Sequence, residues 1–213
     1  MGTQSVGIIN YGVGNLRSVA NAVSEIGATP VVSADIAELR ACNRLILPGV
    51  GAFPHGMEAL QQAGLVEFLC DVGESQTPLL GICLGMQLLT ELSTEFGETK
   101  GLGLLPGAVT QMAAPENGEK LRLPNVGWLK VKRHPELESK LMKLVFEGID
   151  ADASFYFIHS FAVAADNPVA AGTSTYEHIR FASVIARENV IGMQFHPEKS
   201  GATGLRMLEN FIY

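Results

Sequence analysis

The segment from Gly81 to Gly85 reads Gly-Ile-Cys-Leu-Gly and contains a residue suited to covalent chemistry, Cys83. It lies between a short apolar run and a stretch of helical character, and Gly-x-Cys-x-Gly at such a junction is the cysteine form of the nucleophile elbow. There the helix N-terminus favours a thiolate, and the N–H of Leu84 is placed to stabilise an oxyanion. On its own, a lone cysteine in an apolar stretch is more often a small buried hydrophobic residue. A catalytic interpretation therefore requires a base.

A candidate base lies near the other end of the chain, in Gln194-Phe195-His196-Pro197-Glu198. A histidine at the end of a buried strand is more often structural, but here a carboxylate follows two residues later. Pro197 fixes its own φ and keeps His196 extended, so we expect the side chains of residues 196 and 198 on the same side. The carboxylate can then orient the imidazole while the other ring nitrogen takes a proton from sulfur. The pattern predicts a triad of Cys83 (nucleophile), His196 (base) and Glu198 (orienter).

Alternating strands and helices must position these groups in the first half of the chain. The expected strands are 5–10, 29–33, 44–47 and 79–82, and the expected helices are 15–26, 57–62, 65–72 and 84–92. This alternation predicts an α/β fold of three layers, with a doubly wound, mostly parallel sheet. Ligands bind at the carboxyl ends of strands in such sheets, where Asn10, Pro48-Gly49 and Cys83 are all expected.

The second half of the chain is richer in strand patterns. The expected strands are 108–112, 121–123, 127–131, 154–159, 169–176, 181–186 and 190–195, followed by a helix at 204–211. No repeat or linker interrupts the sequence. With 213 residues, the chain is expected to form a single domain over 1–213.

Composition excludes several classes of function. A net charge of −7 argues against nucleic acid as the main partner. Three cysteines without C-x-x-C spacing indicate neither a disulfide framework nor a zinc site. The N-terminus has no signal-peptide pattern, and no apolar run is long enough to span a membrane. We expect a soluble, cytoplasmic protein.

Basic residues are nevertheless concentrated in one stretch. Seven of the 15 Lys and Arg residues lie between 120 and 143, namely Lys120, Arg122, Lys130, Lys132, Arg133, Lys140 and Lys143. The simpler interpretation is a solvated face, and the alternative is a docking or phosphate-facing edge.

The elbow and the His-Pro-Glu segment together resemble the class I (triad) glutamine amidotransferases. More narrowly, the chain resembles the glutaminase subunits of imidazole glycerol phosphate synthase. The resemblance extends from residue 6 to residue 211 and rests on these segments: 10–16 (Asn-Tyr-Gly-Val-Gly-Asn-Leu), 47–53 (Leu-Pro-Gly-Val-Gly-Ala-Phe), 81–89, 125–128 (Asn-Val-Gly-Trp), 156–160 (Tyr-Phe-Ile-His-Ser) and 192–201. Phe161 departs from the tyrosine expected after His-Ser, which concerns a contact near the interface.

The resemblance implies a reaction and a role for each matching residue. Cys83 attacks the side-chain amide of glutamine, ammonia leaves, and water hydrolyses the glutamyl thioester. The implied oxyanion donors are the N–H groups of Leu84 and Val50. The implied substrate-binding residues are Gly49, Gly51, Gln87 and Ser160, and the implied partner-facing residues are Asn10, Asn15, Trp128, Tyr156 and Lys199. Simpler roles exist for these residues too: turn glycines, a solvent-exposed glutamine, turn caps, a core aromatic and a surface lysine. No metal or organic cofactor is implied.

The implied partner is a cyclase subunit with a (β/α)₈ barrel, in a heterodimer. Ammonia is mostly protonated in neutral water, so a glutaminase that supplies a synthase must pass it through a dry channel. Three alternatives stay open: an amidotransferase serving pyridoxal phosphate, anthranilate or GMP synthesis, a non-catalytic regulatory subunit, and a free-standing hydrolase. The presence of all three triad residues argues against a non-catalytic subunit, and a free-standing hydrolase would be active without a partner.

Overall fold

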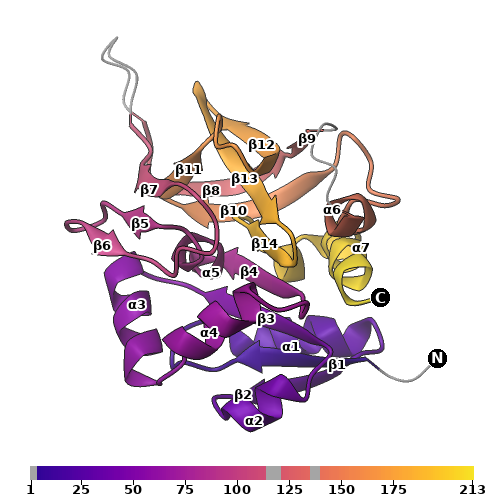
Figure 1. Ribbon diagram of the computed structural model, residues 1–213. Coiled ribbons are helices and arrows are strands. Elements are labelled where there is room, and N and C mark those ends of the chain that lie inside the picture. Colours follow the sequence, from indigo (N-terminus) through magenta and orange to yellow (C-terminus); the bar gives the residue numbers. More distant parts are fainter. Residues whose placement is uncertain (1–3, 114–120, 135–139) are drawn as a thin grey trace.

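The computed structural model describes residues 4–113, 121–134 and 140–213, which form an α/β structure (Figure 1). The helices are α1 (Leu16–Glu25), α2 (Ile36–Arg40), α3 (Phe53–Gln62), α4 (Val66–Gly73), α5 (Leu84–Leu88), α6 (Lys140–Val145) and α7 (Gly201–Ile212), with a 3-10 turn η1 (Pro197–Lys199). The strands are β1 (Ser5–Ile9), β2 (Thr29–Ser33), β3 (Arg44–Gly49), β4 (Leu79–Cys83), β5 (Leu92–Ser93), β6 (Thr99–Lys100), β7 (Ala108–Gln111), β8 (Asn125–Lys130), β9 (Lys132–Arg133), β10 (Ser154–His159), β11 (Phe161–Ala164), β12 (Ala170–Tyr176), β13 (Ile179–Arg187) and β14 (Val190–Met193).

Twelve of the described strands form one mixed sheet, in the order β2-β1-β3-β4-β14-β13-β11-β7-β5-β6, with β12 also paired to β13 and β9 paired to β12. Strands β2, β1, β3, β4 and β14 are parallel. Beyond β14 the neighbours are mostly antiparallel. Strands β8 and β10 pair separately as a two-stranded antiparallel ribbon. The α/β class and the layered fold predicted from the sequence are confirmed.

The parallel strands are buried on both faces, which explains their nearly continuous apolar sequences. In β1, Ile8 packs with α1 and α7 on one face, whereas Ile9 packs with α3, α4 and α5 on the other. In β3, Ile46 and Leu47 divide between the two cores in the same way. The resulting three layers are visible in Figure 1. They align the carboxyl ends of β1, β3, β4 and β14 along one edge of the sheet.

Local sequence explains where two of the helices begin. Asp35 precedes α2, and its side chain accepts hydrogen bonds from the N–H groups of Ala37 and Glu38 at 2.7 and 3.2 Å. Helix α3 begins at Phe53 rather than at the predicted residue 57, because Pro54 occupies its first turn, where a missing N–H costs nothing.

Two predicted elements were wrong. The helix expected over 84–92 ends at Leu88, since the backbone of residues 101–105 donates hydrogen bonds to carbonyls near its end, including Leu102 N to Leu88 O at 2.9 Å. The segment 121–123 is not a strand. The Arg122 carbonyl accepts a hydrogen bond from the Tyr176 hydroxyl at 2.8 Å instead of from a neighbouring strand.

Candidate active site

Cys83 is the last residue of β4 and directly precedes α5 in a sharp turn. Its backbone has φ 54° and ψ −111°, a conformation that L-residues rarely adopt and that is typical of a nucleophile elbow. A Cβ at Gly85 would overlap the Leu47 carbonyl oxygen, and one at Gly81 would lie 2.7 Å from the Gly85 carbonyl oxygen. The two glycines are therefore required by packing around the elbow.

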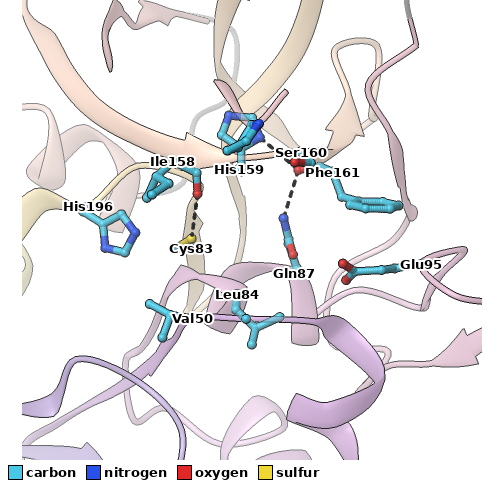
Figure 2. Close-up of a pocket in the computed structure, with 12 residues that line it drawn as sticks. Val50, Cys83, Leu84, Gln87, Glu95, Ile158, His159, Ser160, Phe161 and His196 are labelled. Carbon is cyan, nitrogen blue, oxygen red and sulfur yellow. Dashed lines mark hydrogen bonds between the residues drawn. The ribbon is translucent and has the colours of Figure 1, made fainter. Parts of the chain in front are cut away.

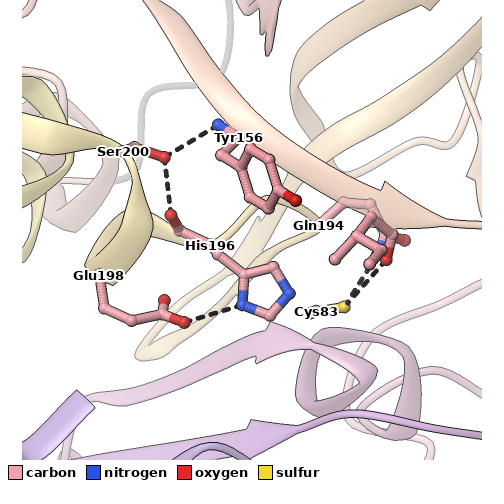
Figure 3. A network of polar contacts seen from close by, with 7 residues as sticks. Cys83, Tyr156, Gln194, His196, Glu198 and Ser200 are labelled. Carbon is pink, nitrogen blue, oxygen red and sulfur yellow. Dashed lines mark hydrogen bonds and ion pairs between the residues drawn. The ribbon is translucent and has the colours of Figure 1, made fainter. Parts of the chain in front are cut away.

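The Cys83 thiol is held by two polar contacts in a nearly closed site. The side chain is 7% exposed. Its Sγ donates to the Ile158 carbonyl at 3.8 Å (Figure 2) and accepts from the Gln194 amide nitrogen at 3.9 Å (Figure 3). Only a protonated sulfur can donate to a carbonyl oxygen, so the contact with Ile158 is one that the thiol form makes. The sulfur must turn away from Ile158 before it can pass its proton to a base.

His196 and Glu198 form a buried pair beside the thiol. The imidazole Nδ1 lies 2.9 Å from Oε1 of Glu198, and the side chains are 2% and 1% exposed. The Nε2 atom has no hydrogen-bond partner among the described residues, and Figure 3 shows the ring turned toward Cys83. The pair thus leaves one ring nitrogen free to exchange a proton with sulfur.

The reason predicted for this pairing was only partly right, because His196 is extended, with φ −99° and ψ 94°, but the chain after it is not. Pro197–Lys199 forms the 3-10 turn η1. The Ser200 hydroxyl closes this turn by donating to the His196 carbonyl at 2.6 Å and accepting from the Tyr156 N–H at 3.0 Å. The turn, rather than strand alternation, returns the carboxylate to the imidazole.

Burial alone would lower the pKa of His196, but the neighbouring Cys83 sulfur and Glu198 carboxylate, through hydrogen bonding and negative charge, outweigh it and raise the pKa to about 9. His159, which also lies at the site, behaves oppositely. Burial lowers its pKa to about 4, only partly offset by its hydrogen bond to the Phe161 carbonyl. A positive charge is therefore stabilised at His196 and disfavoured at His159.

A cavity of about 210 Å³ opens beside the sulfur (Figure 2). It is lined by Val50, Gly51, Cys83, Leu84, Gln87, Glu95, Pro124, Ile158, His159, Ser160, Phe161 and His196. The residues from the β10–β11 turn form one wall, and those from the β3 turn and α5 face them across Cys83 (Figure 2). A space of this size suits a molecule as small as an amino acid.

The predicted oxyanion donors Val50 and Leu84 both line this cavity. Gly51, also at the cavity, has φ 104°, and a Cβ there would meet nothing within 4 Å. Gly49 is not a lining residue and is wedged instead: a Cβ at this position would lie 2.6 Å from the Tyr11 hydroxyl and 2.9 Å from the Gly85 nitrogen. Gly49 therefore shapes the turn, and Gly51 lies where a ligand can approach.

Gln87 lies at the cavity with its amide nitrogen already engaged. That nitrogen donates to the Phe161 carbonyl and to Oε1 of Gln194, each at 3.0 Å. A ligand contact from Gln87 would therefore use its carbonyl oxygen. Ser160, predicted to act beside it, also lines the cavity.

The predicted partner-facing residues lie outside the cavity. Asn10 and Asn15 flank the loop between β1 and α1, where the Asn10 side chain accepts from the Gly12 N–H at 3.2 Å. Trp128 is 55% exposed and pairs across the ribbon with Tyr156. The two rings meet edge to face, with their centroids 6.0 Å apart. Lys199 is exposed in η1.

The basic stretch is only partly visible. Lys120 lies outside the described residues, as do the side chains of Lys140 and Lys143. Arg122, Lys130, Lys132 and Arg133 are exposed, and Lys130 forms an ion pair with Asp152. These contacts are those of a solvated face.

Three residues of the site were missed in the sequence. Gln194 had a usable signal, since it lies two residues before His196 and side chains two apart share a side of an extended chain. Glu95 had none, since it follows a two-residue strand, whereas His159 lies in the segment 156–160 on which the resemblance rests, although no role was predicted for it. Glu95 brings a carboxylate to the cavity, where it also accepts from the Phe53 N–H at 2.7 Å.

The described residues contain neither a metal-binding cluster nor a membrane-spanning helix. Across 4–113, 121–134 and 140–213, no group of three or more His, Cys, Asp or Glu side chains could hold a metal ion. Within the same part of the chain, no helix combines the length and apolar content needed to cross a membrane.

Comparison with known proteins agrees with this geometry. The model of the family "Glutamine amidotransferase class-I" matches residues 7–213. The chain is 41% identical over 206 residues to the imidazole glycerol phosphate synthase subunit HisH of Bacillus cereus, covering 97% of this chain and 93% of that one. It is also 41% identical over 208 residues to the subunit of the same name from Sulfurimonas denitrificans, covering 97% and 96%.

Solved structures agree on the fold. PurLQS from Thermotoga maritima superposes with a TM-score of 0.72 at 17% identity, covering 99% of this chain and 98% of that one. A glutamine amidotransferase crystal structure superposes with a TM-score of 0.68 at 19% identity, covering 97% and 98%. Since residues 7–213 match the family model and the sequence matches the HisH subunits over 97% of the chain, this chain belongs to the class I glutamine amidotransferases, in the family of imidazole glycerol phosphate synthase HisH subunits.

Proposed function

We propose that this chain is the glutaminase subunit of an imidazole glycerol phosphate synthase and hydrolyses glutamine to glutamate and ammonia. The observation that carries the proposal is the arrangement around one small cavity. Cys83 stands on a strained elbow, and the buried pair of His196 and Glu198 leaves Nε2 free beside it.

In the first half of the reaction, Cys83 Sγ attacks the side-chain amide carbon of glutamine, and its proton passes to Nε2 of His196. The N–H groups of Leu84 and Val50 stabilise the negative charge that develops on the amide oxygen. His196 then returns the proton to the departing nitrogen, so ammonia leaves and a glutamyl thioester forms on Cys83. Glu198 orients the imidazole and stabilises its charged form throughout.

In the second half, water attacks the thioester carbon and gives a proton to His196. The carbon–sulfur bond breaks, glutamate leaves, and the sulfur recovers its proton. Every step is an addition, an elimination or a proton transfer, so the residues of the triad suffice. We propose no metal ion and no organic cofactor.

Glutamine carries an α-ammonium and an α-carboxylate that must be recognised at the other end of the cavity. We assign the ammonium to Glu95, whose carboxylate reaches the cavity, and to the free carbonyl oxygen of Gln87. Ser160 and the backbone at Gly51 are the groups proposed to meet the α-carboxylate. Gly49 acts through the shape of the turn.

We propose a cyclase subunit with a (β/α)₈ barrel as partner in a heterodimer, with ammonia passing directly to it. Exposed apolar side chains around the cavity support a docking face. Val50 is 40% exposed and Ile158 39% exposed at the cavity itself, and Val126 and Trp128 extend the exposed face along the ribbon. In the barrel, ammonia would react with a phosphoribulosyl aminoimidazole-carboxamide nucleotide to give imidazole glycerol phosphate and the aminoimidazole carboxamide ribotide of histidine biosynthesis.

We further propose a single domain over 1–213, supported by one family model that spans residues 7–213. A cytoplasmic location is proposed as well, because a nucleophilic thiol stays reduced in that compartment. Neither a nucleic acid nor a membrane is part of the proposed reaction.

The test is glutamate release from glutamine by the chain alone, with the cyclase, and with the cyclase plus its nucleotide. Little release alone and a large rise in the full mixture support the proposal. The blank is Cys83→Ala, and Cys70→Ala, which removes a partly buried thiol in α4, is the matched control. Strong release without a partner would point to a free-standing amidase. Activation by a different synthase would make the assigned partner wrong.

A further inference from the structure

Tyr11 is a buried residue beside the active site that the proposed reaction does not use. It follows β1 by two residues, and its side chain is 5% exposed. The chain turns around it because the Asn10 side chain accepts from the Gly12 N–H at 3.2 Å. At this turn the Tyr11 side chain points inward, and its hydroxyl donates to the Pro48 carbonyl at 2.9 Å in a buried contact.

The Tyr11 hydroxyl lies where the β3 turn meets the elbow. A Cβ at Gly49 would lie 2.6 Å from this hydroxyl and 2.9 Å from both the Gly85 nitrogen and the Leu84 Cβ. The phenol, the Gly49 backbone and the first turn of α5 are thus packed against one another. Any shift of the hydroxyl displaces the segment that carries the Val50 N–H.

The Pro48 carbonyl is enclosed from a second side by the same loop. A Cβ at Gly14 would lie 3.5 Å from both the carbonyl carbon and the carbonyl oxygen of Pro48. Gly14 thus lies close to this peptide, and the Tyr11 hydroxyl holds the peptide that joins Pro48 to Gly49. With that peptide held, rotation of peptide planes is confined to the peptides that follow. Gly51 lies among them with φ 104°, a conformation that glycine adopts readily.

The phenol also stays protonated. Burial, together with the charge of the Cys83 thiolate, raises the pKa of Tyr11 above its ordinary value. A neutral hydroxyl keeps donating to Pro48 when Cys83 ionises, so the anchor persists through the reaction.

We propose that Tyr11 is a positioning residue of the glutaminase reaction, holding the β3 turn so that the Val50 N–H meets the oxyanion formed on the substrate. This inference rests on the proposed function. A tyrosine that merely satisfied its hydroxyl in the core would stabilise the fold without affecting the rate of amide hydrolysis in particular.

The test compares Tyr11→Phe with the unchanged chain, both bound to the cyclase and its nucleotide. Because removal of a single oxyanion donor costs about 100- to 1000-fold in kcat, a displaced donor is expected to lower kcat by about tenfold, with KM changed less than about twofold. Tyr176→Phe is the matched control. It removes a hydroxyl that donates to the Arg122 carbonyl at 2.8 Å, and neither residue lines the cavity.

A second measurement separates positioning from general loosening. This measurement is the rate at which iodoacetamide alkylates Cys83, followed on the Cys83 peptide by mass spectrometry. In that reaction the sulfur attacks a saturated carbon and iodide leaves, so no oxyanion forms. We expect Tyr11→Phe to leave this rate unchanged while hydrolysis falls. Equal losses in both rates, or no loss in hydrolysis, would overturn the inference alone. An unchanged chain that releases no glutamate with the cyclase and nucleotide would overturn the proposed function, and the inference with it.

Discussion

Two buried histidines lie at one cavity and differ in what surrounds their ring nitrogens. In His196 one nitrogen faces the Glu198 carboxylate, which favours a charged ring. In His159, Nδ1 lies 2.9 Å from the Phe161 carbonyl, so this nitrogen must carry the proton. Its Nε2, 3.1 Å from the Asn125 amide nitrogen, is then an acceptor. The site thus concentrates positive charge on the ring that faces the sulfur.

The neutral His159 predicts a loss of stability in acid. Its pKa is about 4 in the folded chain against an ordinary value of 6.5, so the unfolded chain takes up the proton first. Stability is present above pH 6.5 and is lost as the pH falls toward 4, by about 2 kcal/mol between pH 7 and pH 5. Urea unfolding of the unchanged chain and of His159→Gln should show this difference.

His55→Gln, which removes an exposed histidine from α3, is the control and should follow the unchanged chain. A His159→Gln variant that loses as much stability between pH 7 and pH 5 as the unchanged chain would contradict a neutral His159.

His196 predicts the opposite dependence. Burial lowers its pKa, but the thiol and Glu198 raise it to about 9, so the folded chain holds the proton longer than the unfolded one. Its contribution is complete below pH 6.5 and is lost as the pH rises through about 9, up to about 3 kcal/mol. The measurement is the free energy of unfolding at pH 6.5 and pH 9.5, with His196→Asn for comparison. A variant with the same alkaline loss would show that another group causes it.

At the scale of elements, the residues that lie in regular local patterns were predictable. The strands expected at 29–33 and 154–159 coincide with β2 and β10, because alternating or continuous apolar residues there are bounded by turn residues. The elbow was predictable as well, because a tight turn has no room for side chains at positions 81 and 85 and the sequence has glycine at both. Elements that depend on distant partners were not. Helix α5 ends early because residues 101–105 take its carbonyls, and this contact leaves no mark in the sequence near residue 88.

The site followed the same division. Cys83 and His196 lie on strand ends whose order in a parallel sheet follows from their sequence. The η1 turn that joins Glu198 to His196 depends on Ser200 and on the backbone of Tyr156 in a separate ribbon. Sequence reasoning therefore brought Cys83, His196 and Glu198 together as a predicted triad but gave the wrong geometry for its last member.

The contact between α5 and β3 predicts that Gly85 tolerates no side chain. A Cβ there would overlap the Leu47 carbonyl oxygen, and backbone cannot move aside as a side chain can. We expect Gly85→Ala to lower the free energy of unfolding by more than about 2 kcal/mol, measured by urea unfolding.

Gly56→Ala is the matched control for Gly85→Ala. The atoms nearest to its Cβ would be the ends of the Leu84 and Leu88 side chains, at 3.1 to 3.2 Å, and alanine favours a helix over glycine by about 1 kcal/mol. We expect little net change. Equal losses in the two variants would contradict the contact with β3 as the cause.

At the scale of the whole molecule, the proposed nucleophile lies at the edge where the sheet meets the β8–β10 ribbon. One side of this ribbon packs Phe155 and Phe157 into the core, while the other exposes Val126, Trp128 and Ile158. The Ile158 carbonyl accepts from the Cys83 thiol, so the ribbon that carries the exposed apolar face also contacts the nucleophile. A partner that covers this face can therefore change the position of the sulfur.

This arrangement predicts that Trp128 is a main contact for the cyclase. A large aromatic side chain that is 55% exposed gains most of its burial only when a partner covers it. We expect Trp128→Ala to weaken binding of the purified cyclase by about 10- to 100-fold, measured by titration calorimetry. The unfolding midpoint of the isolated chain should change little, because the ring already faces solvent.

Tyr213→Ala is the matched control, since it removes an aromatic ring that is 48% exposed at the end of α7. It should leave the affinity for the cyclase unchanged. If Trp128→Ala and Tyr213→Ala bind the cyclase equally well, the partner does not dock on the ribbon. The loop between β1 and α1, where Tyr11 donates to the Pro48 carbonyl, is then the alternative route from a docked partner to the active site.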